Sequence, residues 1–317
     1  MFERVCIIGF GLIGSSLARA MIKKNLAAAI ICADQSDEVC KTVLRLGLAR
    51  EATTDLAAAV TGCDLVIICA PVGVYGAIGK TIKDHLKPGA ILTDVGSVKQ
   101  AVVEQLLPHV PAGVHFIPAH PIAGTENSGP ESGFAELFVN RWFLITPLEG
   151  TSPKQIERLA TLWEAMESRV DTTMDPKHHD LTLAITSHLP HLIAYTIVGT
   201  ATALGDDLQS EVIKFSASGF RDFTRIAASD PVMWRDVFLN NRDAVLEILQ
   251  RFNEDLTLMQ KAIRQSDGDA LFEHFTRTRA IRRQVIDAGQ ADYRYSKTVQ
   301  EGTPPVVAPE KRLGSGS

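Results

Sequence analysis

The stretch "VCIIGFGLIGSSLARAMIKK" at residues 5–24 decides the fold class. Four apolar residues, typical of a buried strand, lead into Gly9-x-Gly11-x-x-Gly14, and a helical pattern follows. In this pattern the first glycine permits a tight turn, and the second lets a pyrophosphate approach the backbone. The third lets the helix pack closely against the strand. Leu12 and Ile13 complete the turn, whose helix N-terminus favours phosphate groups.

The next apolar run ends in an acidic residue at the expected distance. Asp34 lies twenty residues after Gly14 and is followed by "QSD", without an adjacent arginine. A carboxylate there accepts hydrogen bonds from the adenosine ribose and repels a 2′-phosphate, so NAD is favoured over NADP. Ala70 and Pro71, in "CAPVGV" at 69–74, are expected near the nicotinamide. The alternatives are a glycine-rich turn without ligand and plain loop residues at 69–74.

The first half of the chain alternates short apolar runs with helical patterns, which is typical of a doubly wound α/β domain. The interpretation is an NAD-binding Rossmann-type domain over residues 1–173. The expected strands are Val5–Ile8, Ala29–Ala33, Leu65–Cys69, Ala90–Thr93, His115–Pro118, Arg141–Ile145 and Val170–Thr173.

Long helical patterns replace the strands in the second half. We expect an all-α substrate and dimerisation domain over residues 174–290, because long amphipathic faces often need a second copy to cover them. "SDGD" at 266–269 should separate the last two helices. The residues from 291 to 317, rich in Pro, Gly and Ser, are expected to form a disordered tail. The expected helices span 178–204, 207–217, 231–265 and 269–288.

The composition excludes several classes of protein. A net charge near −5 gives no reason to expect nucleic acid or an anionic membrane as a partner. We find neither a signal peptide nor a run of about eighteen apolar residues, so no transmembrane helix is predicted. The five cysteines form no CxxC pair and indicate a reducing compartment, with the cytoplasm as the default. "HHD" and "SHLPH" do not have a recognised ligand spacing, so no metal is predicted.

Two segments end strands at the carboxyl edge of the sheet, where open α/β sheets bind ligands. They are "TDVGSVK" at 93–99 and "PAHPIAGTE" at 118–126. A histidine there suits proton transfer at neutral pH during hydride transfer from an alcohol, and a nearby serine can fix its tautomer. The alternative for His120 is a structural loop histidine. The side chains expected to converge are Asp94, Ser97, Lys99, His120, Thr125 and Glu126.

Five motifs in order carry a family resemblance: "GFGLIGSSLA", "DVGSVK", "HPIAGTENSG", "SHLPH" and "GFRDFTRIAASDPVMWRD". Over residues 3–290 the chain resembles the prephenate/arogenate (cyclohexadienyl) dehydrogenases of tyrosine biosynthesis. The resemblance implies oxidative decarboxylation of prephenate, L-arogenate or both by NAD in a homodimer. It also implies residue roles. His120 accepts the hydroxyl proton, Ser97 orients it beside the nicotinamide, and Arg225 binds a substrate carboxylate.

The resemblance places further residues at the substrate site: Ser187, His191, Asp222 and Trp234, the last two within the chain or across a dimer interface. Thr125 and Glu126 lie on the substrate loop, and a carboxylate at 126 would attract the ammonium group of arogenate. The alternatives are a solvated loop acid at 126 and an ordinary salt bridge for Arg225. Because we find no regulatory-domain sequence after residue 290, any tyrosine inhibition is expected to act at the active site.

Other functions stay open at this point. An arogenate-specific enzyme is one. A 3-hydroxyacid dehydrogenase would use a lysine for proton transfer, but on the helical domain rather than at Lys99. A non-catalytic NAD sensor predicts that His120→Ala changes only stability, and a pure dimerisation module leaves the convergence of "GSVK" and "HPIAG" unexplained.

Overall fold

The computed structural model describes residues 2–203, 211 and 214–287. The chain divides into two compact units, residues 1–249 and residues from 250 onward. The expected tail at 291–317 lies outside the described residues, as does most of the expected helix at 207–217. All the site residues discussed below belong to the first unit.

A six-stranded parallel sheet forms the centre of the nucleotide-binding part, in the order β3-β2-β1-β4-β5-β6. This order reverses direction between β1 and β4, which makes a ligand crevice at the carboxyl ends of those strands. The strand β3 was not expected from the sequence, since its residues, Glu-Ala-Thr, do not form an apolar run. The strands are β1 (Phe2–Ile8), β2 (Ala27–Ala33), β3 (Glu51–Thr53), β4 (Leu65–Ile68), β5 (Ile91–Asp94) and β6 (His115–Ile117).

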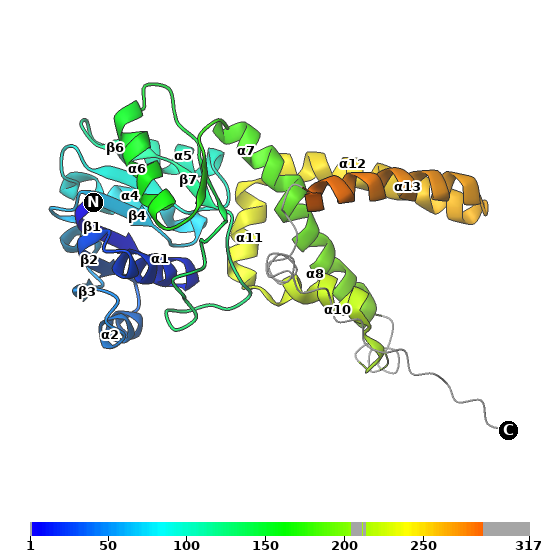
Figure 1. The fold of residues 1–317 in the computed structure, drawn as a ribbon, viewed down its shortest axis with the longest axis horizontal. Coiled ribbons are helices and arrows are strands. Elements are labelled where there is room, and N and C mark those ends of the chain that lie inside the picture. Colours follow the sequence, from blue (N-terminus) through cyan, green and yellow to red (C-terminus); the bar gives the residue numbers. More distant parts are fainter. Residues whose placement is uncertain (1, 204–210, 212–213, 288–317) are drawn as a thin grey trace. The chain divides into compact units, whose positions relative to one another are not determined.

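Helices cover both faces of this sheet, as the helices around β1 and β4 in Figure 1 illustrate. Alternate side chains of β1 enter different cores: Val5 and Ile7 pack with α1, α2 and α6, whereas Cys6 and Ile8 pack with α3, α4 and α5. Burial on both faces explains the continuous apolar runs in the sequence. The helices are α1 (Leu12–Lys23), α2 (Asp37–Arg45), α3 (Leu56–Val60), α4 (Tyr75–Ile82), α5 (Gln100–Leu106) and α6 (Pro153–Ala165).

A second, three-stranded sheet stands beside the first. Strand β7 (Ala119–Pro121) pairs antiparallel with β8 (Trp142–Ile145), which pairs parallel with β9 (Arg169–Asp171). The expectation of a loop around His120 is therefore wrong, because His120 lies in β7 opposite Leu144. The flanking prolines concealed this short strand, since proline is disfavoured in strand interiors.

The helical part begins with α7 (Pro176–Leu183), a π-helical turn (Ala184–His188) and α8 (Leu189–Thr202). The π turn lies just before Pro190, a residue type that distorts helices. The expected helix at 231–265 is divided at Asn241, and the predicted break at 266–269 is confirmed. The remaining elements are α10 (Ser218–Thr224), a 3₁₀ turn (Arg225–Ala228), α11 (Pro231–Asn240), α12 (Arg242–Arg264) and α13 (Gly268–Val285).

The segment Pro176–Thr202 corrects one expectation. By length and composition its 27 residues could cross a membrane, although no such helix was predicted. The segment is not apolar throughout, because it contains the polar residues His179, Asp180 and His188. All three are fully buried in the protein. Their polar partners come from the nucleotide-binding part and from Asn241 at the end of α11.

Candidate active site

The glycine turn between β1 and α1 has the geometry of a dinucleotide-binding turn. Gly9 has φ of +94°, and a Cβ there would lie 2.9 Å from the backbone of Cys69 and Ala70. A Cβ on Gly14 would lie 2.1 Å from the Gly9 carbonyl oxygen. Gly11 is the N-cap of α1 and has open space around its α-carbon, which leaves room for a pyrophosphate at the helix N-terminus.

Asp34, at the end of β2, faces the same turn. Its Oδ2 accepts the Phe10 amide at 2.9 Å, and its Oδ1 accepts the Ser36 amide at 3.0 Å. Each oxygen keeps a lone pair for a ribose hydroxyl. Close approach of Gly9 to the β4 end brings Ala70, and Pro71 after it, to this crevice. The residues present thus fit a dinucleotide; Leu12 is buried and Ile13 is half-buried.

A fully buried ion pair lies directly beneath the strand that carries His120. Lys99 Nζ contacts Asp94 Oδ2 and donates to the Ala119 carbonyl at 2.7 Å, while the Ala119 amide donates to Asp94 Oδ1 at 3.1 Å. Burial raises the pKa of Asp94 and lowers that of Lys99. Both side chains were expected in the substrate crevice; instead they hold the backbone next to His120.

The imidazole of His120 is nearly buried, with 9% of its surface exposed. Its Nδ1 lies 3.0 Å from Nε2 of His179. Burial lowers the pKa of His120 well below its ordinary value, and the neighbouring His179 and Lys99 lower it further. Ser97 was expected to contact the second ring nitrogen of His120. In the structure, the partner of His120 Nδ1 is His179 instead. Ser97 itself is half-buried in the turn after β5.

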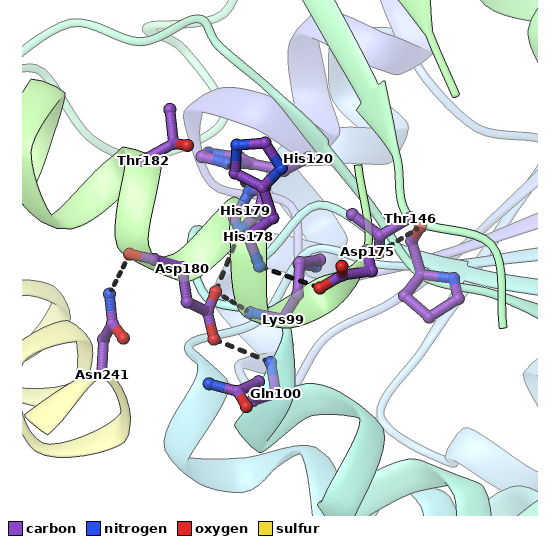
Figure 2. A network of polar contacts seen from close by, with 12 residues as sticks. Lys99, Gln100, His120, Thr146, Asp175, His178, His179, Asp180, Thr182 and Asn241 are labelled. Atoms are coloured by element: carbon purple, nitrogen blue, oxygen red, sulfur yellow. Dashed lines mark hydrogen bonds and ion pairs between the residues drawn. The ribbon is translucent and has the colours of Figure 1, made fainter. Parts of the chain in front are cut away.

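His179 continues into a chain of hydrogen bonds, which Figure 2 shows. Its Nδ1 lies 2.8 Å from Asp180 Oδ1. The same carboxylate accepts the backbone amides of Lys99 at 2.6 Å and of Gln100 at 2.9 Å. Asn241 donates to the Asp180 carbonyl at 2.9 Å. The helical part thereby holds both the turn that carries Ser97 and the strand that carries His120.

An aromatic stack joins α8 and α11. The rings of His191 and Trp234 stack with centroids 3.6 Å apart. His191 Nδ1 donates to the Ser187 carbonyl at 2.8 Å, which leaves Nε2 as an acceptor. Burial lowers the pKa of His191, and Arg225 lowers it further. Within the described residues, the buried Nε1–H of Trp234 has no hydrogen-bond partner.

Arg225 and Glu126 lie close together although 99 residues separate them. Arg225 NH1 donates to Glu126 Oε2 at 2.8 Å, and their side chains are 55% and 35% exposed. Thr125 is exposed and its Oγ1 accepts the Asn127 amide. Asp222 is exposed on α10 and pairs with its neighbour Arg221, and among the described residues no hydrogen bond or ion pair joins it to the other candidate residues.

Sequence reasoning missed His179, Asp180 and Asn241. The signal for the first two was "HHD" at 178–180, interpreted only as an unconvincing metal motif. Asp175 and Pro176 start a helix there, with the Asp175 side chain accepting the His178 amide. Which face of that helix meets β7 is not written in the local pattern.

Comparisons with known proteins place both parts of the chain in one family. Family models match twice: the prephenate dehydrogenase nucleotide-binding domain over residues 17–172, and the prephenate dehydrogenase dimerization domain over residues 175–277. A cyclohexadienyl dehydrogenase of Zymomonas mobilis is 39% identical over 89% of this chain and 96% of its own length. A prephenate dehydrogenase of Bacillus subtilis is 32% identical over 87% of this chain and 74% of its own.

Solved structures agree as well. The crystal structure of prephenate dehydrogenase from Aquifex aeolicus, in complex with hydroxyphenyl propionate and NAD⁺, is similar with a TM-score of 0.83 and 30% identity, covering 90% of this chain and 99% of that one. The Synechocystis arogenate dehydrogenase has a TM-score of 0.74 and 27% identity, over 89% of this chain and 99% of that one. The chain belongs to the prephenate dehydrogenase family.

Proposed function

We propose that this protein is an NAD-dependent cyclohexadienyl dehydrogenase, which oxidatively decarboxylates prephenate, L-arogenate or both in tyrosine biosynthesis. The observation that carries the proposal is His120, a buried histidine held by two strands at the carboxyl edge of a dinucleotide-binding sheet. Relatives named for both substrates support it, one a cyclohexadienyl dehydrogenase and one an arogenate dehydrogenase.

The chemistry assigns a task to each group. When bound, NAD supplies the hydride acceptor for the C4 hydrogen of the ring. His120 Nε2, the nitrogen away from His179, takes the hydrogen bond and the developing proton of the C4 hydroxyl, with Ser97 beside it. The ring carboxylate leaves as CO₂, its bonding electrons complete the aromatic ring, and the proton returns to the product's phenol oxygen.

Arg225 is proposed to bind the side-chain carboxylate of the substrate. A guanidinium offers a planar fork to a carboxylate. In this structure Glu126 already occupies part of that fork, so a substrate carboxylate competes with Glu126. Once displaced, Glu126 can receive the ammonium of arogenate, whereas prephenate has a keto group there. The pair therefore links affinity to the choice between the two substrates.

The wall of the pocket is proposed to be His191, Ser187 and Trp234. The Nε1–H of Trp234, buried and without a partner among the described residues, and the Nε2 of His191 are proposed to meet polar groups of the ligand. Thr125 and Asp222 are proposed at the rim. Tyrosine carries the same phenol and a carboxylate, so we expect inhibition at this site, competitive with prephenate.

We further propose a homodimer in the cytoplasm. Large apolar side chains are exposed on the helical elements, which suits the dimerization-domain match. All five cysteines are free thiols, as a reducing compartment maintains them. Examples of the exposed side chains are Ile185, Ile197, Phe272, Phe275 and Ile281. Light scattering coupled to size exclusion should give twice the mass of the chain.

The reaction is tested by product balance. Wild-type protein with prephenate and NAD should yield NADH, CO₂ and 4-hydroxyphenylpyruvate in equal amounts. His120→Asn should lower kcat by about 10²–10⁴-fold, the usual contribution of general acid–base catalysis, while NAD binding is retained. NADH without CO₂, or a fully active His120→Asn variant, would contradict the assignment.

A further inference from the structure

We propose that His179 and Asp180 are positioning residues that fix the tautomer of His120, so that the lone pair of Nε2 faces the substrate hydroxyl. The inference rests on the proposed function and assigns work to two residues outside the substrate contacts. Both are fully buried, and both lie on α7, far in sequence from β7.

Asp180 sets the direction of the hydrogen-bond chain. Its carboxylate accepts the backbone N–H groups of Lys99 and Gln100, and an ionised carboxylate has no proton to donate. The third contact, 2.8 Å from Oδ1 to His179 Nδ1, must therefore be donated by the histidine. His179 Nδ1 carries a proton.

His179 passes this constraint to His120. Burial lowers the pKa of His179, so its ring is neutral and its Nε2 is an acceptor. The contact of 3.0 Å with His120 Nδ1 then requires a proton on that nitrogen. A neutral His120 with Nδ1 protonated has its lone pair on Nε2. Without this chain the ring would be free to adopt the other tautomer, which cannot accept the hydroxyl proton.

The hydrogen-bond chain also stabilises the positive charge that His120 acquires during the reaction. When His120 takes the proton of the hydroxyl, its ring becomes cationic. The Nδ1–H then donates more strongly to His179, whose other nitrogen is bound to the Asp180 carboxylate. The aspartate of a Ser-His-Asp triad orients and stabilises its histidine in the same way, with one ring fewer between them.

Residues outside this hydrogen-bond chain hold it in place. Asn241 donates to the Asp180 carbonyl at 2.9 Å and contacts His188 Nδ1 at 3.0 Å. Figure 2 shows Asn241 approaching Asp180 from the side opposite His120. Because Asp180 also binds the amides at the start of α5, one carboxylate holds both the histidine chain and the loop after β5.

The direct test observes the tautomer without any turnover. The protein is labelled with ¹⁵N in its histidine rings, and the signals of His120 are identified by their loss in His120→Gln. We expect a neutral ring with Nδ1 protonated in the wild type. A neutral ring protonated at Nε2 would overturn the inference, whatever the substrate proves to be.

The kinetic test compares three variants. His179→Phe keeps a ring but removes the acceptor, and should lower kcat for prephenate by about 100-fold with KM within a factor of about three. His179→Gln restores an acceptor for Nδ1–H and a donor for Asp180, and should recover at least about tenfold of that loss. His178→Phe, at the adjacent exposed position, is the matched control and should behave as wild type.

Thermal unfolding and NAD titration accompany each variant. If His179→Phe keeps wild-type kcat, or if the Gln and Phe variants lose kcat equally although both bind NAD, His179 is merely structural and the inference fails. If wild-type protein turns over neither prephenate nor arogenate, the proposed function fails instead, and the ring spectra still decide the tautomer. Should His179→Phe not fold, the spectra and His179→Gln carry the test.

Discussion

The ion pair of Lys99 and Asp94 gives the sharpest test of how the site is built. Both side chains are fully buried, and together they bind the two polar groups of the Ala119 peptide next to His120. Lys99→Met removes the cation and leaves a carboxylate in the interior. Breaking such a pair from one side costs about 3–5 kcal/mol. At roughly 2–4 °C per kcal/mol, we expect the melting temperature to fall by about 10 °C.

A double-mutant cycle separates the interaction energy of the Lys99–Asp94 pair from the other effects of the two substitutions. Asp94→Asn alone leaves Lys99 buried without its counterion and should cost a similar amount. The double variant has no unpaired charge, so it should be about 2–3 kcal/mol more stable than the sum of the single losses predicts. It should remain less stable than wild type, because Asp94 also accepts the Gly96 and Ala119 amides and an asparagine has one acceptor oxygen.

The assay is urea unfolding at pH 8 followed by circular dichroism, with NAD binding as a check of the fold. Lys23→Met is the control, since Lys23 and Glu136 form an exposed pair that should barely affect the midpoint. The double variant should still be active. Its turnover should be slower than that of the wild type, because the Ala119 carbonyl has lost its hydrogen bond from Lys99. A loss below about 1 kcal/mol for Lys99→Met, or purely additive losses, would refute this account of the buried pair.

Three other expectations follow from the same contacts. The free energy of unfolding should fall as the pH drops below about 6.5, because burial lowers the pKa of His188 to about 4 and the unfolded chain takes up the proton first. His188→Gln should reduce that slope by up to about 1.4 kcal/mol per pH unit, and an unchanged slope would contradict this. The acid limb of kcat/KM should lie well below about pH 6.5, since burial depresses the pKa of His120, and a limb at or above that value would show that the base is more exposed than in this structure. Glu126→Gln should lower KM for prephenate by up to about fivefold and raise KM for arogenate, which parallel substrate titrations would show; no change for either would mean that Glu126 plays no part at the site.

Much of the fold was predictable from local pattern. Buried parallel strands appear in the sequence as apolar runs. Gly14 must be glycine, because a Cβ there would lie 2.1 Å from the Gly9 carbonyl oxygen. Both features can therefore be recognised in the sequence. The strands β3 and β7 were missed because neither is an apolar run: β3 is Glu-Ala-Thr, and β7 has prolines on both sides of His120. The membrane-length segment at 176–202 escaped notice because its polar residues interrupt the run.

The sequence indicated which residue types form the candidate site, but not which of these residues contact one another. His120 and Arg225 have chemistry that suggests a role, and strand ends locate His120 at the crevice. His179 and Asp180 act through contacts that span 59 and 81 residues, which depend on how α7 docks on β7 and α5. The pairing of Arg225 with Glu126 across 99 residues is of the same kind. Docking of distant helices is set by packing, and no local pattern encodes it.

The most direct measurement is initial-rate formation of NADH by the wild-type protein, with prephenate and with arogenate, each paired with NAD and with NADP. The account predicts turnover of at least one substrate with NAD and a strong preference over NADP, because the carboxylate of Asp34 is expected to repel a 2′-phosphate. The ratio of kcat/KM for the two substrates then measures what Glu126 contributes. Protein that binds NAD yet oxidises neither substrate would contradict the proposed function.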